Sequence, residues 1–150
     1  MSYEKDLLTG IAQMISDSSI AVYKPAGAYD PAEKGVVFGG WPQSPDACVV
    51  LNYTPVTDAT MVPMGKGILE VHSRGAAGDP FGATEIASPI FDLIHGMTDH
   101  YFGSAHVIQL LRDHVAPLEM DASKRYKRVD IYYVDVDAPS TVNRPSNGWD

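Results

Sequence analysis

Apolar and polar positions follow a helical period near the start of the chain and a two-residue period in several later segments. Residues 3–16 carry apolar side chains at the i, i+3, i+4 and i+7 spacing of one helical face, which predicts an amphipathic helix. These side chains are Leu7, Leu8, Ile11, Met14 and Ile15. Ser2 precedes them and is a suitable N-cap, because its hydroxyl oxygen can accept a hydrogen bond from a backbone N–H of the first turn.

The central part of the chain, residues 66–112, has the pattern of a strand, a helix and a second strand. Residues 68–73 alternate apolar and polar side chains, and residues 106–111 are mostly apolar, so both segments predict strands. Between them Asp79-Pro80 has the composition of a helix start, with an N-cap followed by proline at the first helical position. The apolar stripe of this helix is formed by Ile86, Ile90, Leu93, Ile94 and Met97.

The remaining strands come from apolar runs that surround this central unit. Residues 48–53, Cys-Val-Val-Leu-Asn-Tyr, are β-branched and apolar and predict a strand. Shorter runs at 20–23 and 36–38 indicate two further short strands. Residues 128–136 alternate strictly, with Val129, Ile131 and Tyr133 on one face and Asp130, Tyr132 and Val134 on the other. We expect this last strand to pair antiparallel with residues 106–111, since consecutive strands usually neighbour each other.

Together these elements predict an α+β fold, a mainly antiparallel sheet with two helices packed on one face. We expect a single domain at residues 1–137 and a C-terminal tail or arm at residues 138–150. Residues 24–47 and 54–67 are rich in breakers and predict long loops, which are often functional, and 113–127 predicts an irregular turn of the chain. In the second loop, apolar residues including Met61 and Met64 either form a contact surface or pack on the core, and the sequence leaves both arrangements open.

Charge and composition narrow the classes of function. The formal net charge is −8 at pH 7, which disfavours binding to nucleic acid through phosphate contacts. An acidic chain could also line a passage through which DNA slides, although composition alone does not show this. The single cysteine, Cys48, lies in an apolar run, so we expect a buried thiol and no intramolecular disulfide. The first residues are acidic and no apolar run is long enough to span a membrane, so we expect a soluble protein made in the cytoplasm.

Candidate chemistry is sparse. Asp92, His95 and Asp99 are spaced i, i+3 and i+7 and would share one helical face, but this is also the ordinary polar side of an amphipathic helix. The chain has no His-Glu-x-x-His, Gly-x-Ser-x-Gly or Walker phosphate loop. The basic cluster at 124–128 would contact either DNA phosphates or a protein partner, and the surrounding acidity favours the protein partner. We therefore expect no catalytic residue, metal or cofactor.

A resemblance to a known family adds more than the chemistry does. Residues 35–53 contain Pro42-Gln-Ser-Pro45-Asp46 between two apolar runs, and resemble the strand, Pro-x-x-Pro-Asp turn and strand of small phage head–tail joining proteins. The later motifs of that family also follow in the same order. They are Val71-His-Ser-Arg-Gly, the Asp79-Pro80 helix start, the hairpin approach at 125–128, the alternating strand that ends at Val136, and the Asn143-Arg-Pro ending. Over most of its length, the chain resembles the tail terminator (minor capsid) proteins of long-tailed bacteriophages.

This resemblance implies a structural protein of the virion, with no catalytic residue to carry over. Members assemble as a hexameric ring that caps the finished tail tube, ends its polymerisation and joins it to the head. The implied partners are further copies of the chain, the tail tube protein and a head-completion or connector protein, and DNA passes through the centre without sequence-specific binding. Candidate contacts with other subunits or the tail are Met61, Met64, Arg74, Arg125, Arg128, Arg144 and Trp149.

Two alternatives stay open. The long 24–47 stretch and Pro89 inside the predicted helix depart from the family pattern, which leaves another phage neck or tail-completion protein possible. The alternative of a different class is a small metal-dependent hydrolase that uses Asp92, His95 and Asp99.

Overall fold

The computed structural model describes residues 2–59, 64–137 and 141–143, and these residues form an α+β fold. Helix α1 spans Tyr3–Asp17 and helix α2 spans Gly82–Ile94. The strands are β1 (Gly35–Phe38), β2 (Cys48–Asp58), β3 (Met64–Arg74), β4 (Met97–Phe102), β5 (Ala105–Val115), β6 (Glu119–Met120) and β7 (Tyr126–Asp137). Their order in the sheet is β1-β2-β3-β7-β5-β4, and the short β6 also pairs with β7.

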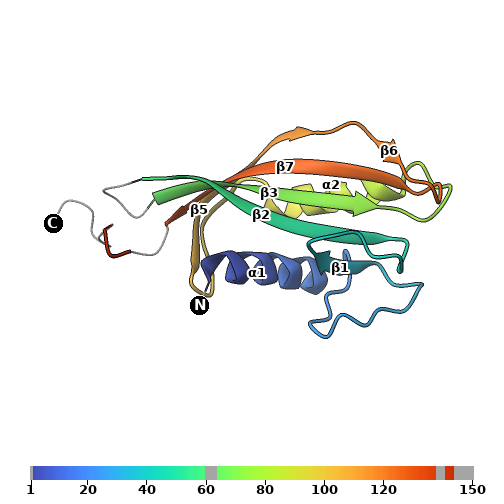
Figure 1. Cartoon of the computed structure of the whole chain (residues 1–150), viewed down its shortest axis with the longest axis horizontal. Helices are drawn as coiled ribbons and strands as arrows, with labels where there is room; N and C mark the ends of the chain where they lie inside the picture. Colours follow the sequence, from blue (N-terminus) through green and yellow to red (C-terminus); the bar gives the residue numbers. More distant parts are fainter. Residues whose placement is uncertain (1, 60–63, 138–140, 144–150) are drawn as a thin grey trace.

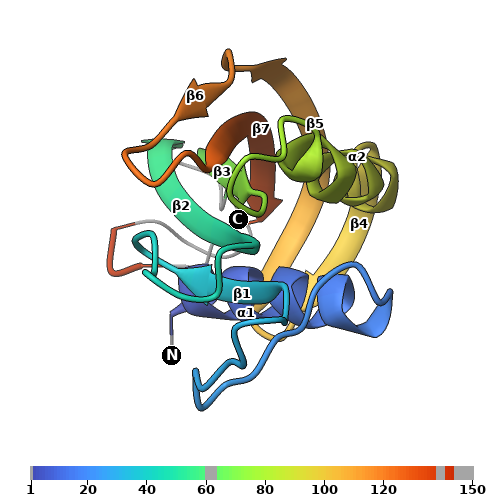
Figure 2. The same cartoon turned by 90° about the vertical axis from the view of Figure 1, so that its right-hand side faces the viewer.

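The sheet is curled and mixed rather than purely antiparallel. Strands β1 and β2 pair in parallel, while the other strand pairs of the described residues are antiparallel. Figure 2 shows the strands arranged along an arc, with α1 lying across its open side. Helix α1 contacts β2, β4 and β5, and α2 contacts β3, β7 and β5, so both helices cover the concave face of the sheet. The prediction of two helices on one face is therefore confirmed.

The core follows from the alternation along the central strands. In β7 the side chains of Tyr132, Val134 and Val136 are buried, and Tyr132 lies opposite Leu69 of β3. The apolar stripes of the two helices pack against this face. They are formed by Leu7, Ile11 and Ile15 of α1 and by Ile86, Ile90 and Ile94 of α2. The predicted antiparallel pairing of the last strand with the segment at 106–111 is also present, as the β5–β7 pair.

The largest correction concerns residues 54–67, which were predicted to be a loop. Strand β2 continues to Asp58 and β3 begins at Met64, so the two strands form one long hairpin. Figure 1 shows their paired ends extending beyond the start of α1. Pro55 is accommodated because the β2–β3 register shifts between Pro55 and Thr57. Met64 is 51% exposed, which places it on the surface, whereas Met61 lies outside the described residues.

Further corrections concern the ends of elements. Helix α2 begins at Gly82 rather than Asp79, whose carboxylate instead accepts a hydrogen bond from the Phe81 N–H at 3.0 Å. The helix ends at Ile94, and Met97 opens β4, a strand that the apolar pattern did not reveal. The segment 113–127 is not wholly irregular, since it contains the end of β5, all of β6 and the start of β7. The run at 20–23 contributes one isolated bridge, between Val22 and Gly35.

Two glycines let α2 approach the end of β3. A Cβ atom added to Gly75 would lie 2.8 Å from the Cα atom of Gly82, and a Cβ added to Gly82 would lie 2.9 Å from the Cα atom of Gly75. Such a clash with backbone atoms cannot be relieved by a change of rotamer, as a clash with a flexible side chain can. The two glycines therefore set how closely α2 packs on the sheet.

We expect Gly75→Ala to lower the free energy of unfolding by about 1–3 kcal/mol, because the added methyl group overpacks a backbone contact. Urea denaturation of the two proteins would measure this difference. Gly40→Ala is the matched control, since a Cβ there meets no atom within 4 Å. Equal stability of Gly75→Ala and the parent chain would contradict the close packing of α2.

Candidate interaction surface

The three residues of the candidate metal site do not converge. Helix α2 ends at Ile94, so the helical spacing that would align Asp92, His95 and Asp99 is broken. His95 Nδ1 accepts a hydrogen bond from the Arg112 N–H at 3.0 Å. Asp99 lies in β4, and its carboxylate contacts His106 of β5. Among residues 2–59, 64–137 and 141–143, no group of three or more His, Cys, Asp or Glu side chains is placed to hold a metal ion.

Arg74, one of the predicted contact residues, is buried and holds a loop of its own chain. Its Nε donates to the Asp46 carbonyl at 2.7 Å, and its Nη2 donates to the carbonyls of Pro42 and Pro45 at 2.7 and 2.9 Å. The guanidinium carbon lies 5.1 Å from the centre of the Trp41 ring. Burial lowers the pKa of Arg74 from its usual value, but an arginine of this kind remains charged.

Arg125 holds the same loop from its other side. Its Nη1 donates to the Gln43 carbonyl at 2.9 Å and to the Asp46 carboxylate at 3.1 Å. Its Nε donates to the Asp121 carboxylate at 2.8 Å. Nearby, burial raises the pKa of the Cys48 thiol to about 11, so this cysteine is neutral at pH 7. Two arginines therefore fix the segment 42–46 through its backbone carbonyls.

Arg128 belongs to a buried ion pair between the sheet and α2. Its Nε and Nη2 donate to the two oxygens of Asp130 at 2.7 and 3.2 Å, and Arg112 donates to the same carboxylate at 3.3 Å. Arg112 also lies over the Phe91 ring of α2, at 3.9 Å from its centre. A buried carboxylate needs such partners, because leaving it unpaired costs several kcal/mol.

The predicted contact residues thus fall into two groups. The three arginines at 74, 125 and 128 use their donors within the chain, whereas Met64 is exposed. Met61, Arg144 and Trp149 lie outside the described residues. Contact of any of these seven residues with another subunit stays a prediction.

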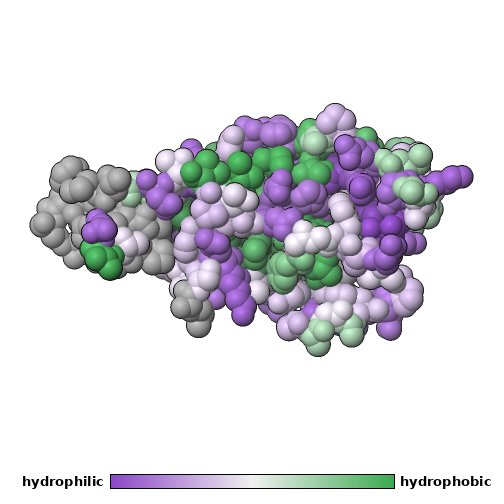
Figure 3. All heavy atoms as spheres, in the orientation of Figure 1, coloured by the Kyte–Doolittle hydropathy of each residue, from purple (hydrophilic) through white to green (hydrophobic). Residues whose placement is uncertain are grey.

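The convex face of the sheet, which neither helix covers, is a surface that the sequence pattern was not used to predict. Its side chains alternate with those of the core along β3, β5 and β7. One row across these strands is Ile68, Tyr133 and Leu111, of which Tyr133 and Leu111 are 41% and 39% exposed. We call the set Ile68, Leu111, Val129, Ile131 and Tyr133 the open-face patch. Figure 3 shows a row of apolar side chains along β7.

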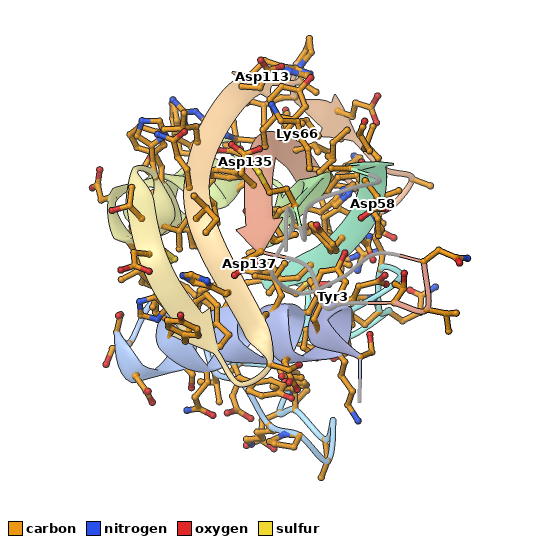
Figure 4. All side chains as sticks on the ribbon, turned by 90° about the vertical axis from the view of Figure 1, so that its left-hand side faces the viewer. Tyr3, Asp58, Lys66, Asp113, Asp135 and Asp137 are labelled. Atoms are coloured by element: carbon orange, nitrogen blue, oxygen red, sulfur yellow. The ribbon has the colours of Figure 1, made fainter. Side chains whose placement is uncertain are left out.

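Charged groups border the open-face patch toward the hairpin end. Lys66 Nζ lies 3.6 Å from an Asp135 oxygen and 5.7 Å from the centre of the Tyr133 ring. Lys66, Tyr133 and Asp135 also line a shallow cavity of about 230 Å³, together with Gln109, Leu111, Arg112 and Asp113. Figure 4 looks onto this end of the molecule, where Asp58, Lys66, Asp135 and Asp137 lie. The patch is therefore apolar along β7, has a mixed-charge border, and lies beside Glu70 and His72 of β3, which are the cross-strand partners of Ile131 and Val129.

The sequence did contain a signal for this patch. In the alternating strand at 128–136, both faces carry apolar side chains: Tyr132 and Val134 on one face, and Val129 and Ile131 on the other. A strand whose outer face is left in water normally has polar side chains there, so apolar residues on both faces indicate that both faces are covered. The exposed Leu111 and Tyr133, beside the half-buried Ile68, Val129 and Ile131, suit a protein–protein contact site.

Comparison with known proteins gives a likeness of fold. No family model and no curated protein matches the chain. Its structure is similar to a chain of the solved structure "Virion of native gene transfer agent (GTA) particle", with a TM-score of 0.62 and 13% sequence identity. The match covers 88% of this chain and 95% of that chain. At this identity the likeness shows a shared fold over nearly the full length of both chains.

We expect Arg74→Lys to lower the free energy of unfolding by about 2–4 kcal/mol, because one ammonium cannot replace the three hydrogen bonds of the guanidinium. Denaturation followed by Trp41 fluorescence, in a Trp149→Phe background, would measure the loss. Lys127→Gln is the control, since Lys127 also lies beside Trp41, at 5.6 Å, but bonds no carbonyl of the 42–46 segment. Stability changes of similar size in the two variants would contradict the role of Arg74.

Proposed function

We propose that this chain is a structural protein of a phage-like virion, and specifically a tail terminator that caps the tail tube and joins it to the head. The observation that carries the proposal is the likeness of fold to a chain of a gene transfer agent virion, which spans 88% of this chain and 95% of that one. The resemblance of the sequence motifs between residues 35 and 145 to those of tail terminators supports the same proposal. The protein would then reside in the neck or tail of the particle.

The open-face patch supports an assembled state. A sheet with one face covered by helices and the other partly apolar loses solvent-exposed apolar area when a second protein covers it. In the proposed terminator this second protein is another copy of the chain. The arginine-held segment 42–46 gives the neighbouring end of the sheet a fixed shape, so a contact there would require little rearrangement.

A ring needs two different surfaces on each subunit, because a head-to-tail contact joins one patch to another. The helix side of the sheet provides a second surface, a cavity of about 510 Å³ lined by residues of α1, β1 and β2 and of the segment after α1. Leu8, Tyr23, Phe38 and Tyr53 supply its apolar lining, and the Tyr23 and Phe38 rings meet edge to face at 5.7 Å. The open-face patch and this cavity lie on opposite faces of one sheet, an arrangement compatible with ring closure.

The other proposed partners follow from the same role. A terminator contacts the tail tube protein on one side of the ring and a head-completion or connector protein on the other. The net charge of −8 suits a lumen through which DNA moves without adhering. A neighbouring neck protein would share the fold and the ring, so binding to tail tubes is the observation that separates these two roles.

Light-scattering mass measurement with negative-stain imaging of the same sample tests the ring. We expect a hexameric ring with a central hole, in solution or on the ends of purified tail tubes. Rings bound to the ends of tail tubes would support a terminator. Rings that form but do not bind tail tubes would support another neck protein. A chain that stays monomeric both alone and with tail tubes would overturn the proposal.

We expect Leu111→Asp and Tyr133→Asp to weaken ring formation at least tenfold in protein concentration, since a carboxylate in an apolar contact costs more than about 1.4 kcal/mol. The matched control is Phe81→Asp, a 68% exposed aromatic residue at the start of α2, away from the open-face patch. Circular dichroism would show that all three variants keep the fold. Unchanged assembly of both patch variants would exclude the open face as the contact.

A further inference from the structure

His106 lies between two carboxylates at the end of the sheet where β7 stops. Its Nε2 is 2.7 Å from an Asp99 oxygen, and its Nδ1 is 3.3 Å from an Asp137 oxygen. A carboxylate only accepts hydrogen bonds, so both contacts are satisfied only when both ring nitrogens carry a proton. The neutral ring has one N–H and would lose one of the two bonds. The geometry therefore selects the charged imidazolium.

The surrounding strands hold the ring in this position. His106 of β5 is the cross-strand partner of Tyr101 in β4 and of Asp137 in β7. The rings of His106 and Tyr101 stack with their centres 4.0 Å apart and their planes 5° apart. Asp99 has a φ of +48°, a left-handed conformation that is uncommon outside glycine, where its carboxylate meets His106. One imidazole thus connects three strands.

Two other carboxylates of the described residues near this end, Asp135 and Asp6, have partners of their own. Asp135, the preceding outward residue of β7, lies 3.6 Å from Lys66. From α1, the Asp6 carboxylate accepts hydrogen bonds from the Ser104 N–H and hydroxyl at 2.8 and 2.6 Å. His106 is therefore the cation that the Asp99 and Asp137 carboxylates share.

We propose that His106, Asp99 and Asp137 form a proton-controlled latch, which holds the end of β7 to β4 and β5 when the imidazole is charged and releases it when the imidazole is neutral. Asp137 is the last residue of β7, so the latch lies at the root of the C-terminal segment, residues 138–150. Figure 4 shows Asp137 at this end of the sheet. The latch is a property of the single chain and does not depend on ring formation.

The direction of the pH dependence follows from the charges. The hydrogen bond to Asp99 raises the pKa of His106 above its ordinary value of 6.5, and Asp137 acts in the same direction while burial opposes both. A raised pKa in the folded chain means that the latch contributes its full stabilisation below pH 6.5. This contribution is lost as the pH rises through the folded-state pKa. The latch therefore opens toward alkaline pH.

An NMR titration of the histidine side chains tests the first half of the proposal. We expect His106 to titrate above 6.5 in the parent chain, and its pKa to fall toward 6.5 in Asp99→Asn and in Asp137→Asn. The matched control is Asp113→Asn, which removes a carboxylate bonded to His114 and leaves the latch intact. A His106 pKa at or below 6.5 in the parent chain, or one that both latch variants leave unchanged, would overturn the proposal.

Amide hydrogen exchange tests the opening itself. Protection factors at Val136 and Asp137 should fall severalfold from about pH 6 to about pH 9 in the parent chain, and should vary little with pH in His106→Gln, which has no titrating group at this position. Amides in the middle of α1 are the internal control. Equal pH profiles at Val136 and Asp137 in the two proteins would show that the histidine does not control the strand end. Neither outcome depends on whether rings form.

Discussion

The register of β3 against β7 is the constraint on which the rest of the structure depends. It places Leu69 opposite Tyr132 and Val71 opposite Asp130, so these side chains face the helices together. A slip of one residue would turn the whole set to the other face of the sheet. The neighbouring β2–β3 register is reinforced at Gly67, where an added Cβ would lie 2.2 Å from the Tyr53 hydroxyl oxygen. If the β2–β3 register shifted by one residue, the Tyr53 ring would meet a residue with a Cβ atom instead of Gly67, and the contact would be lost.

The same register creates the open-face patch. Because every second residue of β7 faces the helices, the residues between them, including Ile131 and Tyr133, must face outward. Their side chains lie outside the core cluster that packs against the two helices. The proposed contact with another copy of the chain accounts for their apolar character. The inward residues of β7 form part of the core, and the outward residues between them form the proposed contact surface. Asp137 of the latch is one of the outward residues.

The periodicity of apolar side chains was enough to predict the elements in which that period is regular. It did not predict elements whose formation depends on tertiary contacts. The alternation at 128–136 and the stripe of the first helix predicted β7 and α1 nearly to their ends. The hairpin was missed because Pro55 and Gly67 are usually loop residues, although here Pro55 lies at a register shift and Gly67 makes room for a ring. Strand β4 was hidden because the helical stripe appeared to reach Met97, beyond the turn at Gly96.

The candidate contacts show a deeper limit. Arg74 was predicted to be a contact residue from the resemblance to tail terminators. Its acceptors in the structure are the backbone carbonyls of Pro42, Pro45 and Asp46, and such acceptors leave no side-chain pattern in the sequence. Arg125 and Arg128 are likewise paired within the chain. With these arginines paired within the chain, the surface that remains for the proposed subunit contact is the open-face patch, in which Leu111 and Tyr133 are exposed. In the proposed assembly, a contact built on apolar area gains free energy from water release and fixed shape rather than from ion pairs.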